Sequence, residues 1–225
     1  MNRVFVGVDP RQPLGYNVLQ WSIHRHAKKR VSVEPLMLPK LPITRRGLTE
    51  FTYSRYLVPY LCGYEGSAVF MDADIVVTGD IGELFEQVDG MSAVQVMQDQ
   101  PKFEWASVML FNNAKCRTLT PEWIDDPDNK PNTLSFGAVG SFSRDWNHCV
   151  NKEEPRDAKL HHYTEGVPAW EEVQGNPADQ HWFDARDAML HTVSWQELMG
   201  GSVHAQAVIQ RYMKRRFGID LMPRG

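Results

Sequence analysis

The sequence predicts an α/β fold, because patterns typical of strands and of helices alternate through its first half. Residues 4–8 form a short apolar run of the kind found in buried strands, and residues 31–36 offer a second strand. Between these two runs, Leu19, Ile23 and Ala27 recur at helical spacing. A strand, a helix and a second strand in this order make a βαβ unit, which joins two parallel strands.

The next elements continue this alternation. A helix that carries Arg55 is expected over residues 51–61, and a buried strand is expected over residues 67–77. Two further strands are expected over residues 92–97 and 107–111. Strands and helices therefore alternate throughout the first half of the chain.

The second half has a less regular pattern. Thr120 followed by Pro121 is a typical helix start, with threonine as the N-cap and proline at the first helical position. Residues 125–131 are polar and rich in turn-forming residues, so we expect a loop there. An amphipathic helix is expected over residues 203–217, and Gly218 is expected to end it.

The composition favours one globular domain. Of 225 residues, 42% are hydrophobic and 23% are charged, which is enough to bury a sizeable core. The net charge of −4 argues against a broad nucleic-acid-binding surface, and the basic residues 28–30 and 214–216 are expected to mark helix ends. No apolar run is long enough to span a membrane, and we expect no signal peptide, because the apolar run that follows residues 1–3 is too short for one. The three cysteines lack metal-binding spacing, so we expect a reducing, cytoplasmic location.

Asp72 and Asp74 are the most informative residues of the chain, because they interrupt an apolar strand pattern. A buried carboxylate without a partner is unfavourable, so two of them one residue apart require a cation, hydrogen-bond donors or water. Oxygen ligands suit magnesium, manganese or calcium rather than zinc. The sequence therefore predicts a divalent-cation site at this pair.

The motifs around the aspartates resemble the signature of glycosyltransferase family eight, which includes glycogenin and bacterial lipopolysaccharide galactosyltransferases. Residues 55–61 are similar to its arginine-bearing helix, which ends in a proline and a leucine. Residues 68–85 are similar to its strand into Asp-x-Asp, its Gly-Asp-Ile turn, and the leucine and aromatic that follow. The first strand with Asp9, residues 107–112 and residues 160–170 look like other elements of the family. The resemblance covers about the first 115 residues well and the rest in patches.

The resemblance implies a GT-A-type fold, with a mixed, mostly parallel sheet flanked by helices in one nucleotide-diphospho-sugar transferase domain. It implies a single domain over residues 1–225, with a nucleotide-sugar-binding half over residues 1–115 and an acceptor-side half with the C-terminal helices over residues 116–225. The implied activity is metal-dependent, retaining transfer of a hexose from a UDP-sugar. The acceptor is an unidentified carbohydrate, lipid-linked glycan or protein.

The resemblance also implies roles for particular residues. Asp72, Asp74 and His162 are expected to hold Mn²⁺, or Mg²⁺ as the second choice, because a mixed oxygen and imidazole set lies nearer manganese in ligand preference. His161 is expected to be structural. No catalytic base or nucleophile is assigned, and we expect attack from the leaving-group face, which also retains configuration. The residues expected to contact the donor are Val8, Asp9, Arg55, Asp72, Ala73 and Asp74.

Three features depart from the family pattern. Val167 and Ala169 flank Pro168, where the family has a lysine before the proline. Trp105 replaces an asparagine that binds sugar in the family, and it offers a stacking face instead. No Asp-Gln pair is found, and residues 135–137 lie in its region without the same chemistry. These departures leave open a nucleotide-sugar-binding protein that has kept the fold and lost turnover.

Two other enzyme classes use paired aspartates. Phosphatases of the haloacid dehalogenase type begin with a strand into Asp-x-Asp, but here the motif follows a complete βαβ unit and Ile75 stands where a glycine is expected. A nucleotidyltransferase would need a glycine-rich loop with a basic tail after the first strand, and none is present. Both classes are less favoured than a glycosyltransferase.

Overall fold

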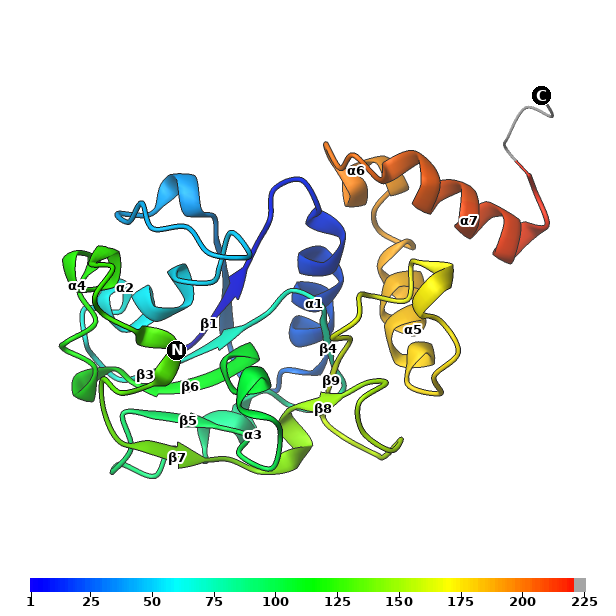
Figure 1. Cartoon of the computed structure of the whole chain (residues 1–225). Coiled ribbons are helices and arrows are strands. Elements are labelled where there is room, and N and C mark those ends of the chain that lie inside the picture. The colour runs from blue at the N-terminus through cyan, green and yellow to red at the C-terminus, as the bar shows by residue number, and fades with distance from the viewer. Residues whose placement is uncertain (221–225) are drawn as a thin grey trace.

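The computed structural model describes residues 1–220, and its architecture confirms the predicted α/β class (Figure 1). A six-stranded sheet has the order β2-β1-β3-β6-β5-β7, and a three-stranded sheet has the order β4-β9-β8. The strands of the larger sheet are β1 (Asn2–Gly7), β2 (Val31–Leu36), β3 (Ser67–Met71), β5 (Val94–Val96), β6 (Val108–Asn112) and β7 (Val139–Ser141). Those of the smaller sheet are β4 (Ile75–Val77), β8 (His148–Cys149) and β9 (Leu160–His162).

The larger sheet is mixed and mostly parallel, as predicted. β1 pairs in parallel with β2 and β3, and β5 pairs in parallel with β7. β6 is antiparallel to both of its neighbours, β3 and β5. The sheet therefore starts from the predicted βαβ unit and is completed by β7, which comes from the second half of the chain.

Seven α-helices and several short 3₁₀ segments connect the strands in the described part of the chain. The helices are α1 (Pro13–His26), α2 (Val58–Leu61), α3 (Gly82–Phe85), α4 (Pro121–Asp125), α5 (Asp179–Met189), α6 (Trp195–Met199) and α7 (Ala205–Phe217). The 3₁₀ segments are Leu38–Lys40, Ser54–Leu57, Lys102–Ser107, Asn113–Lys115, Pro131–Thr133, Arg144–Trp146 and Glu171–Val173.

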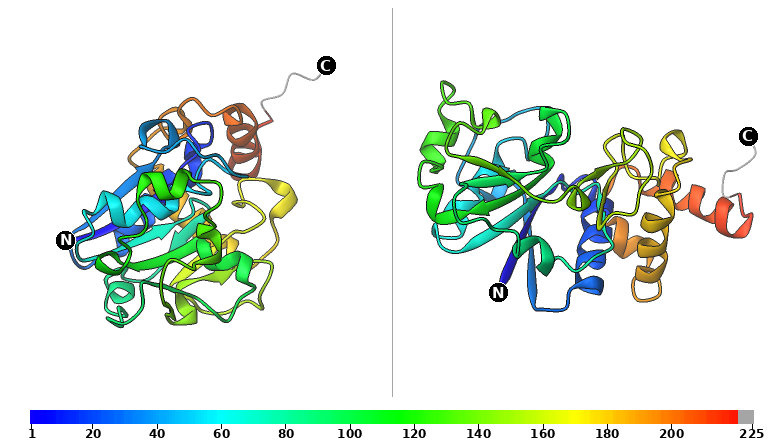
Figure 2. Two further views of the ribbon diagram at one scale, coloured as in Figure 1. Left: turned by 60° about the vertical axis from the view of Figure 1, so that its left-hand side comes forward. Right: turned by 90° about the horizontal axis from the view of Figure 1, so that it is seen from below.

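The central strands bury both faces, which explains their continuous apolar sequences. In β1, Val4 and Val6 pack toward the layer that contains Leu19 and Ile23 of α1. Phe5 points to the opposite face and packs in a second cluster. The far side of α1 packs on α5 and α6, so α1 lies between the larger sheet and the C-terminal helices (Figure 2).

The expected strand over residues 67–77 is in fact two strands in different sheets. β3 ends at Met71, β4 starts at Ile75, and Asp72, Ala73 and Asp74 connect the two sheets. The backbone N–H of Asp72 donates to the carbonyl of Ser107 at 2.9 Å, beyond the last ladder pair of β3 and β6. The prediction of one strand was wrong because the change of pairing partner is a long-range event.

The expected helix over residues 51–61 is shorter and less regular than predicted. Ser54–Leu57 is 3₁₀, and only Val58–Leu61 is α-helical. Pro59 lies in the first turn of α2, where its missing N–H costs no hydrogen bond, and it favours a helix that starts there. Arg55 is therefore carried by a 3₁₀ turn.

The helix ends differ from expectation by a few residues. α1 ends at His26, before the basic residues 28–30, so these residues do not terminate it. Lys28 instead lies 3.9 Å from Glu83 and Lys29 3.6 Å from Glu86, as exposed ion pairs. The basic residues 214–216 do occupy the last turn of α7, which Gly218 ends in the left-handed conformation with φ of 67°.

The second half of the chain contributes strands to both sheets. β7 pairs with β5, and β9 pairs with β4, so residues after 115 complete sheets that begin before it. The division into a donor half and an acceptor half stays a prediction. Residues 221–225 of the predicted domain lie outside the described residues.

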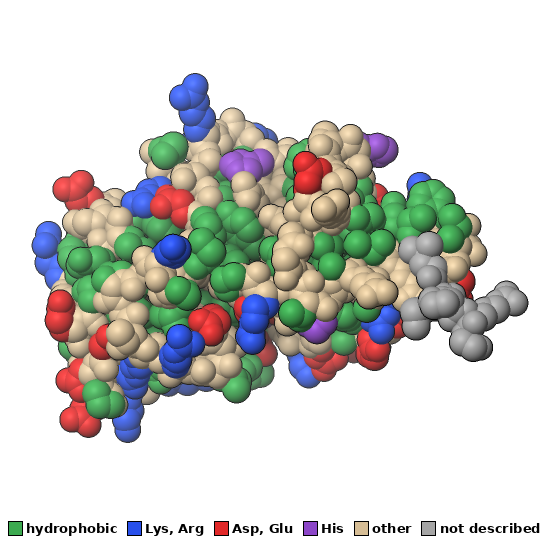
Figure 3. All heavy atoms as spheres, turned by 90° about the horizontal axis from the view of Figure 1, so that it is seen from above, with side chains coloured by type: hydrophobic (Ala, Val, Ile, Leu, Met, Phe, Trp, Pro, Cys, Tyr) green, Lys and Arg blue, Asp and Glu red, His purple; other side chains and the backbone are tan. Residues whose placement is uncertain are grey.

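Within residues 1–220, no helix is long and apolar enough to cross a membrane. All three cysteines are free thiols. Basic and acidic side chains are intermixed on the face shown in Figure 3, without a patch of one sign.

Candidate metal and donor site

The chain crossing between the two sheets brings Asp72 and Asp74 to His162. Asp74 immediately precedes β4, and Ile75 is the register partner of His162 in β9. The backbone N–H of Tyr163 donates to the carbonyl of Asp74 at 2.9 Å. The antiparallel register therefore places the histidine beside the aspartate, although the two are far apart in sequence.

The three side chains form a cluster with the dimensions of a cation site. One ligand atom from each of Asp72, Asp74 and His162 lies within 4.8 Å of the others. Nε2 of His162 is 3.3 Å from Oδ1 of Asp74. Oδ1 of Asp72 and Oδ1 of Asp74 are both buried and accept no hydrogen bond from the described residues. Ion-pair contacts with Arg55 and His162 are their only compensation there, so a bound cation would stabilise them further. The residues present fit a divalent cation that accepts oxygen and imidazole ligands.

The electrostatics of the cluster also favour binding of positive charge. Burial raises the pKa of the Asp72 carboxyl to about 6, while Arg55 opposes this shift and Asp74 adds to it. Burial alone would lower the pKa of His162, but the charge and hydrogen bond of Asp74 outweigh this effect, and the pKa lies well above its ordinary value. A cation at this site would replace the proton that the acidic environment otherwise retains on the imidazole.

Arg55 is buried beside the aspartates, in contrast to an ordinary surface ion pair. Its Nη2 lies 3.2 Å from Oδ1 of Asp72, and its side chain is 11% exposed. The guanidinium also donates to the carbonyls of Phe51 and Ala106. These contacts hold the arginine in one orientation, with a charged edge in the wall of a cavity.

Two cavities meet at Asp74. The larger has a volume of about 670 Å³ and is lined by Arg55, Asp72, Asp74 and His162 among others. The smaller has a volume of about 190 Å³, and Asp74 and Phe51 line both. The site can therefore hold a ligand that extends to both sides of the aspartates.

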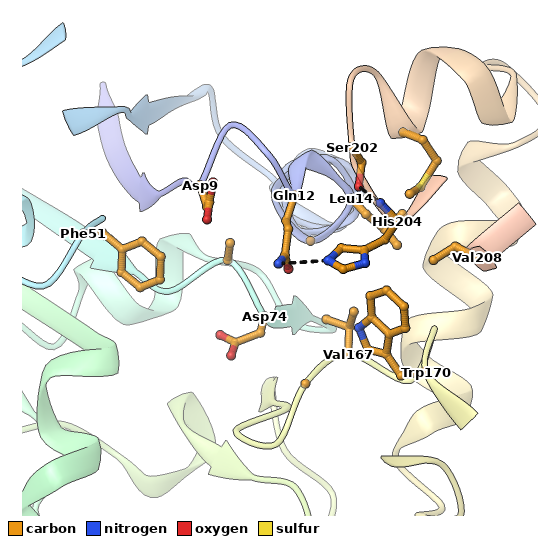
Figure 4. Close-up of a pocket in the computed structure, with 14 residues that line it drawn as sticks. Asp9, Gln12, Leu14, Phe51, Asp74, Val167, Trp170, Ser202, His204 and Val208 are labelled. Carbon is orange, nitrogen blue, oxygen red and sulfur yellow. Dashed lines mark hydrogen bonds between the residues drawn. The ribbon is translucent and has the colours of Figure 1, made fainter. Parts of the chain in front are cut away.

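The smaller cavity lies between the N-terminal end of α1 and the C-terminal helices. Figure 4 shows Gln12, Trp170 and His204 around it, with Asp9 and Asp74 on the side of the sheets. Nε2 of His204 is 3.4 Å from the side-chain nitrogen of Gln12. An apolar wall with a few convergent polar groups is typical of a small-molecule site.

The other predicted donor residues differ in accessibility. Asp9 lines the smaller cavity, and its hydrogen bond with Arg11 lowers the pKa of the carboxyl. Ala73 also lines this cavity, and α1 approaches it so closely that a Cβ on Gly15 would lie 2.8 Å from the Ala73 carbonyl oxygen. Val8 is only 5% exposed and packs in the core, so its side chain is not available to a ligand.

The departures from the family pattern have structural consequences. Val167 lines the smaller cavity, where the family's lysine would bring a charge. Trp105 lines neither cavity; its indole N–H donates to the Gln100 carbonyl and its half-buried ring packs against the core, and the expected stacking face stays a prediction. Of the region around residues 135–137, Asn132 and Thr133 reach the larger cavity.

Sequence reasoning missed two residues that contact His162. Oε2 of Glu104 lies 4.0 Å from its Nδ1, and Sγ of Cys149 lies 3.9 Å from the same atom. Glu104 is in a 3₁₀ turn, and Cys149 is brought to His162 by the parallel pairing of β8 with β9. No local pattern in the sequence indicates either contact.

His161 has the structural role that was expected. It is 1% exposed, and its Nδ1 lies 3.1 Å from Nδ1 of His148. In the turn after β4, the Asp80 carboxylate accepts from the backbone N–H of Gly82 at 3.1 Å.

The architecture is that of a GT-A-type α/β protein, the fold of solved glycosyltransferases. The bifunctional glycosyltransferase WbbM superposes with a TM-score of 0.60 at 16% identity, covering 93% of this chain and 51% of WbbM. The glycosyltransferase GlyE of Streptococcus pneumoniae TIGR4 gives a TM-score of 0.63 at 17% identity, covering 92% and 65%. The galactosyltransferase LgtC, solved with donor and acceptor sugar analogues, gives 0.63 at 11% identity, covering 88% and 99%.

Sequence comparison identifies one further relative. Protein CDI of Arabidopsis thaliana is 29% identical over 218 residues, covering 76% of this chain and 82% of that protein. No protein-family model matches the chain. The chain spans about half of WbbM and about two thirds of GlyE, so their whole activities do not transfer to it.

Proposed function

We propose that the protein is a metal-dependent, retaining glycosyltransferase, similar to family eight, that transfers a hexose from a UDP-sugar. The observation that supports this most is the cluster of Asp72, Asp74 and His162 at the meeting point of two cavities in a GT-A fold. A nucleotide-sugar has a diphosphate between two larger groups, and this shape matches a charged site between two cavities.

Asp72, Asp74 and His162 are proposed to hold Mn²⁺, with Mg²⁺ as the second choice. The bound cation would neutralise the charge that develops on the departing diphosphate. Arg55 positions Asp72 through their ion pair and presents positive charge to the larger cavity. Asp9 and Ala73 are proposed to face the nucleoside in the smaller cavity, and Val8 would contribute only through its backbone.

The distribution of carboxylates supports attack from the leaving-group face. Among the described residues, the carboxylates that line the larger cavity are Asp72, Asp74 and Glu104, and each is grouped with His162. A double displacement would need a carboxylate nucleophile beneath the anomeric carbon, on the face opposite the leaving group. With no carboxylate on a separate wall of this cavity, the departing phosphate is proposed to take the acceptor proton.

Two side chains are placed to replace contacts of the missing family lysine. Lys102 lines the larger cavity, and His204 lines the smaller one, which Asp74 also lines. Both come from segments outside the late family element that carries Val167. The Lys102 ammonium can supply a positive contact to a diphosphate held at the aspartates, and the His204 ring can offer an N–H donor.

The mouth of the larger cavity suits a carbohydrate acceptor. Leu48 and Phe103 line it, yet they are 92% and 83% exposed, so they present apolar surface to solvent. Aromatic rings bind the apolar faces of sugars while leaving hydroxyls free to hydrogen-bond. The proposed acceptor is a carbohydrate, a lipid-linked glycan or a protein, and the first two would offer such a face. A cytoplasmic location is also proposed.

The proposal is tested by UDP release from a panel of UDP-sugars with and without Mn²⁺. We expect at least one donor to give Mn²⁺-dependent release, and the double variant Asp72→Ala with Asp74→Ala to abolish it. The matched control is Asp126→Ala with Asp128→Ala, which removes two exposed carboxylates, also one residue apart, from a loop outside both cavities.

The outcomes separate the competing functions. UDP release that is unchanged in the double aspartate variant would refute the assigned metal site. Mn²⁺-dependent UDP binding in calorimetry, with no release from any donor, would show a nucleotide-sugar-binding protein. Phosphate release from phosphomonoesters would show a phosphatase instead.

A further inference from the structure

The two ring nitrogens of His162 face two different sets of ligand atoms. Nε2 is 3.3 Å from Oδ1 of Asp74, within the cluster described above. Nδ1 faces the other way, toward Sγ of Cys149 at 3.9 Å and Oε2 of Glu104 at 4.0 Å. His162 is 3% exposed, so both nitrogens depend on these neighbours for partners.

We propose that Glu104, Cys149 and Nδ1 of His162 form a second cation site, which binds a thiophilic divalent cation such as Zn²⁺. The ligand atoms of these residues all lie within 4.8 Å of one another. A thiolate, an imidazole and a carboxylate are a ligand set that zinc accepts, whereas manganese and magnesium bind thiolate poorly. The second site thus differs from the first in the chemistry of its ligands.

The spacing of the atoms fits tetrahedral zinc after small movements. Zn–S and Zn–N bonds of about 2.3 and 2.0 Å place sulfur and nitrogen roughly 3.6 Å apart on one ion. The observed separation between Sγ of Cys149 and Nδ1 of His162 is 3.9 Å. Three protein ligands leave a fourth position for water.

Surrounding groups support this site in two ways. The Gln100 side-chain N–H donates to Sγ of Cys149 at 3.0 Å and to Oε1 of Glu153 at 2.7 Å, so the amide is fixed while it stabilises charge on sulfur. Glu104 and His162 line the larger cavity, which gives an ion a path from solvent. On binding, the Cys149 thiol loses its proton to solvent and the thiolate becomes the ligand.

Asp74 changes its role between the two sites. With a cation on Nδ1, Nε2 of His162 carries the proton and donates it to Asp74, which is the carboxylate–histidine–zinc arrangement that orients many zinc ligands. With a cation on Asp72 and Asp74, Nε2 is itself the ligand. One neutral imidazole cannot do both, so the two cations compete for His162.

Cobalt(II) is the probe that tests the site, because a cobalt–thiolate bond gives a near-ultraviolet charge-transfer band that carboxylate or imidazole ligands do not give. We expect one equivalent of Co²⁺ to produce the band in the full chain, and one equivalent of Zn²⁺ to remove it. The band is expected to be lost in Cys149→Ser and retained in Cys62→Ser, which alters the half-buried thiol away from the site. It is also expected to be retained in Asp72→Asn.

No band in the wild-type protein, or a band that persists in Cys149→Ser, would overturn the proposal. Glu104→Gln is the second variant, since it keeps the thiol and is expected to weaken Zn²⁺ binding about 10-fold or more. Unchanged Zn²⁺ affinity in Glu104→Gln would also overturn the three-ligand site. Circular dichroism of each variant is the check that the substitution leaves the protein folded.

Competition is measured from the electron paramagnetic resonance signal of free Mn²⁺. One equivalent of Zn²⁺ is expected to weaken Mn²⁺ binding about 10-fold in the wild type and to have no such effect in Cys149→Ser. Equal weakening in both proteins would show that zinc displaces manganese directly at the aspartates, which would overturn the competition through His162. These measurements need no sugar donor, so their results test the second cation site whether or not the protein transfers a sugar.

Discussion

His161 and His162 are neighbours on β9, yet their surroundings give them opposite protonation. Both are almost fully buried, at 1% and 3% exposure. His161 faces the rings of His148 and His181, whereas His162 faces Asp74 and the other acids of the cleft. Since burial is nearly equal, the groups opposite each ring decide which form is stable.

The consequence for pH dependence has opposite signs at the two positions. Burial, together with the neighbouring imidazoles of His181 and His148, lowers the pKa of His161 to about 3. His161 therefore contributes stability that is complete above its unfolded pKa of about 6.5 and is lost as the pH falls. The raised pKa of His162 gives the metal-free protein stability that is complete below about 6.5 and is lost as the pH rises through the folded value.

The largest expected effect distinguishes the two histidines by activity. His162→Asn is expected to lower Mn²⁺-dependent UDP release about 100-fold or more, because the cluster loses its imidazole ligand. His161→Phe is expected to retain release within a few-fold, as measured by initial rates at saturating Mn²⁺. Equal losses in the two variants would show that His162 has no role in UDP release that His161 lacks.

The next largest effect is expected at Arg55, whose guanidinium compensates the charge of Asp72 beside His162. Arg55→Met is expected to lower the free energy of unfolding of the metal-free protein by about 3 kcal/mol, because Asp72 is left buried without its ion-pair partner. Urea denaturation at pH 8 measures this loss. The loss is expected to shrink as the pH falls, because protonation of Asp72 removes the uncompensated charge.

Arg46→Met is the control for this prediction. The Arg46 side chain is 70% exposed and pairs with Glu50, so its removal is expected to cost no more than about 0.5 kcal/mol. A loss in Arg55→Met as small as that of the control would show that Asp72 does not need Arg55 to compensate its buried charge.

A smaller effect is expected for His161, which should make the free energy of unfolding depend on pH in the acid range. The wild-type protein is expected to lose about 2 kcal/mol between pH 7.5 and pH 5 from His161 alone, because only the unfolded chain binds the proton there. His161→Phe is expected to flatten this part of the stability profile, measured by urea denaturation at several pH values. An unchanged slope would mean that His161 is charged in the folded protein.

The smallest effect is expected at His181, whose ring stacks on His161 with centroids 4.4 Å apart. After burial, the electrostatic effect of His181 is one of the causes of the low pKa of His161. Because His181 is exposed, His181→Leu is expected to change stability at pH 5 by only a few tenths of a kcal/mol. A change above about 1 kcal/mol would show that the acid sensitivity comes mainly from His181.

The elements that the sequence predicted well are those whose signal is local. The βαβ unit was recognisable because β1 buries both faces and α1 has a regular apolar stripe. Thr120 was recognisable as a cap, and its hydroxyl does accept from the Trp123 N–H. The Asp-x-Asp pair was recognisable because two charges in an apolar run need a partner.

The features that were not predictable depend on pairing between distant segments. Nothing near Asp72 shows that the chain leaves one sheet for another, because both β3 and β4 are apolar. Glu104 and Cys149 reach His162 through the geometry of a 3₁₀ turn and the β8–β9 register. The position of His204 at the smaller cavity likewise depends on how the C-terminal helices pack on α1.

The location of the cluster at the crossing between two sheets has a consequence for folding order. During synthesis the aspartates emerge well before β9, whose register with β4 places the histidine beside them. Contacts between such distant segments form late, since a long loop must close first. A nascent chain that has paired β3 with β6 therefore has both aspartates but lacks the histidine of the cluster. Cation binding by all three residues would occur only after β9 has paired with β4.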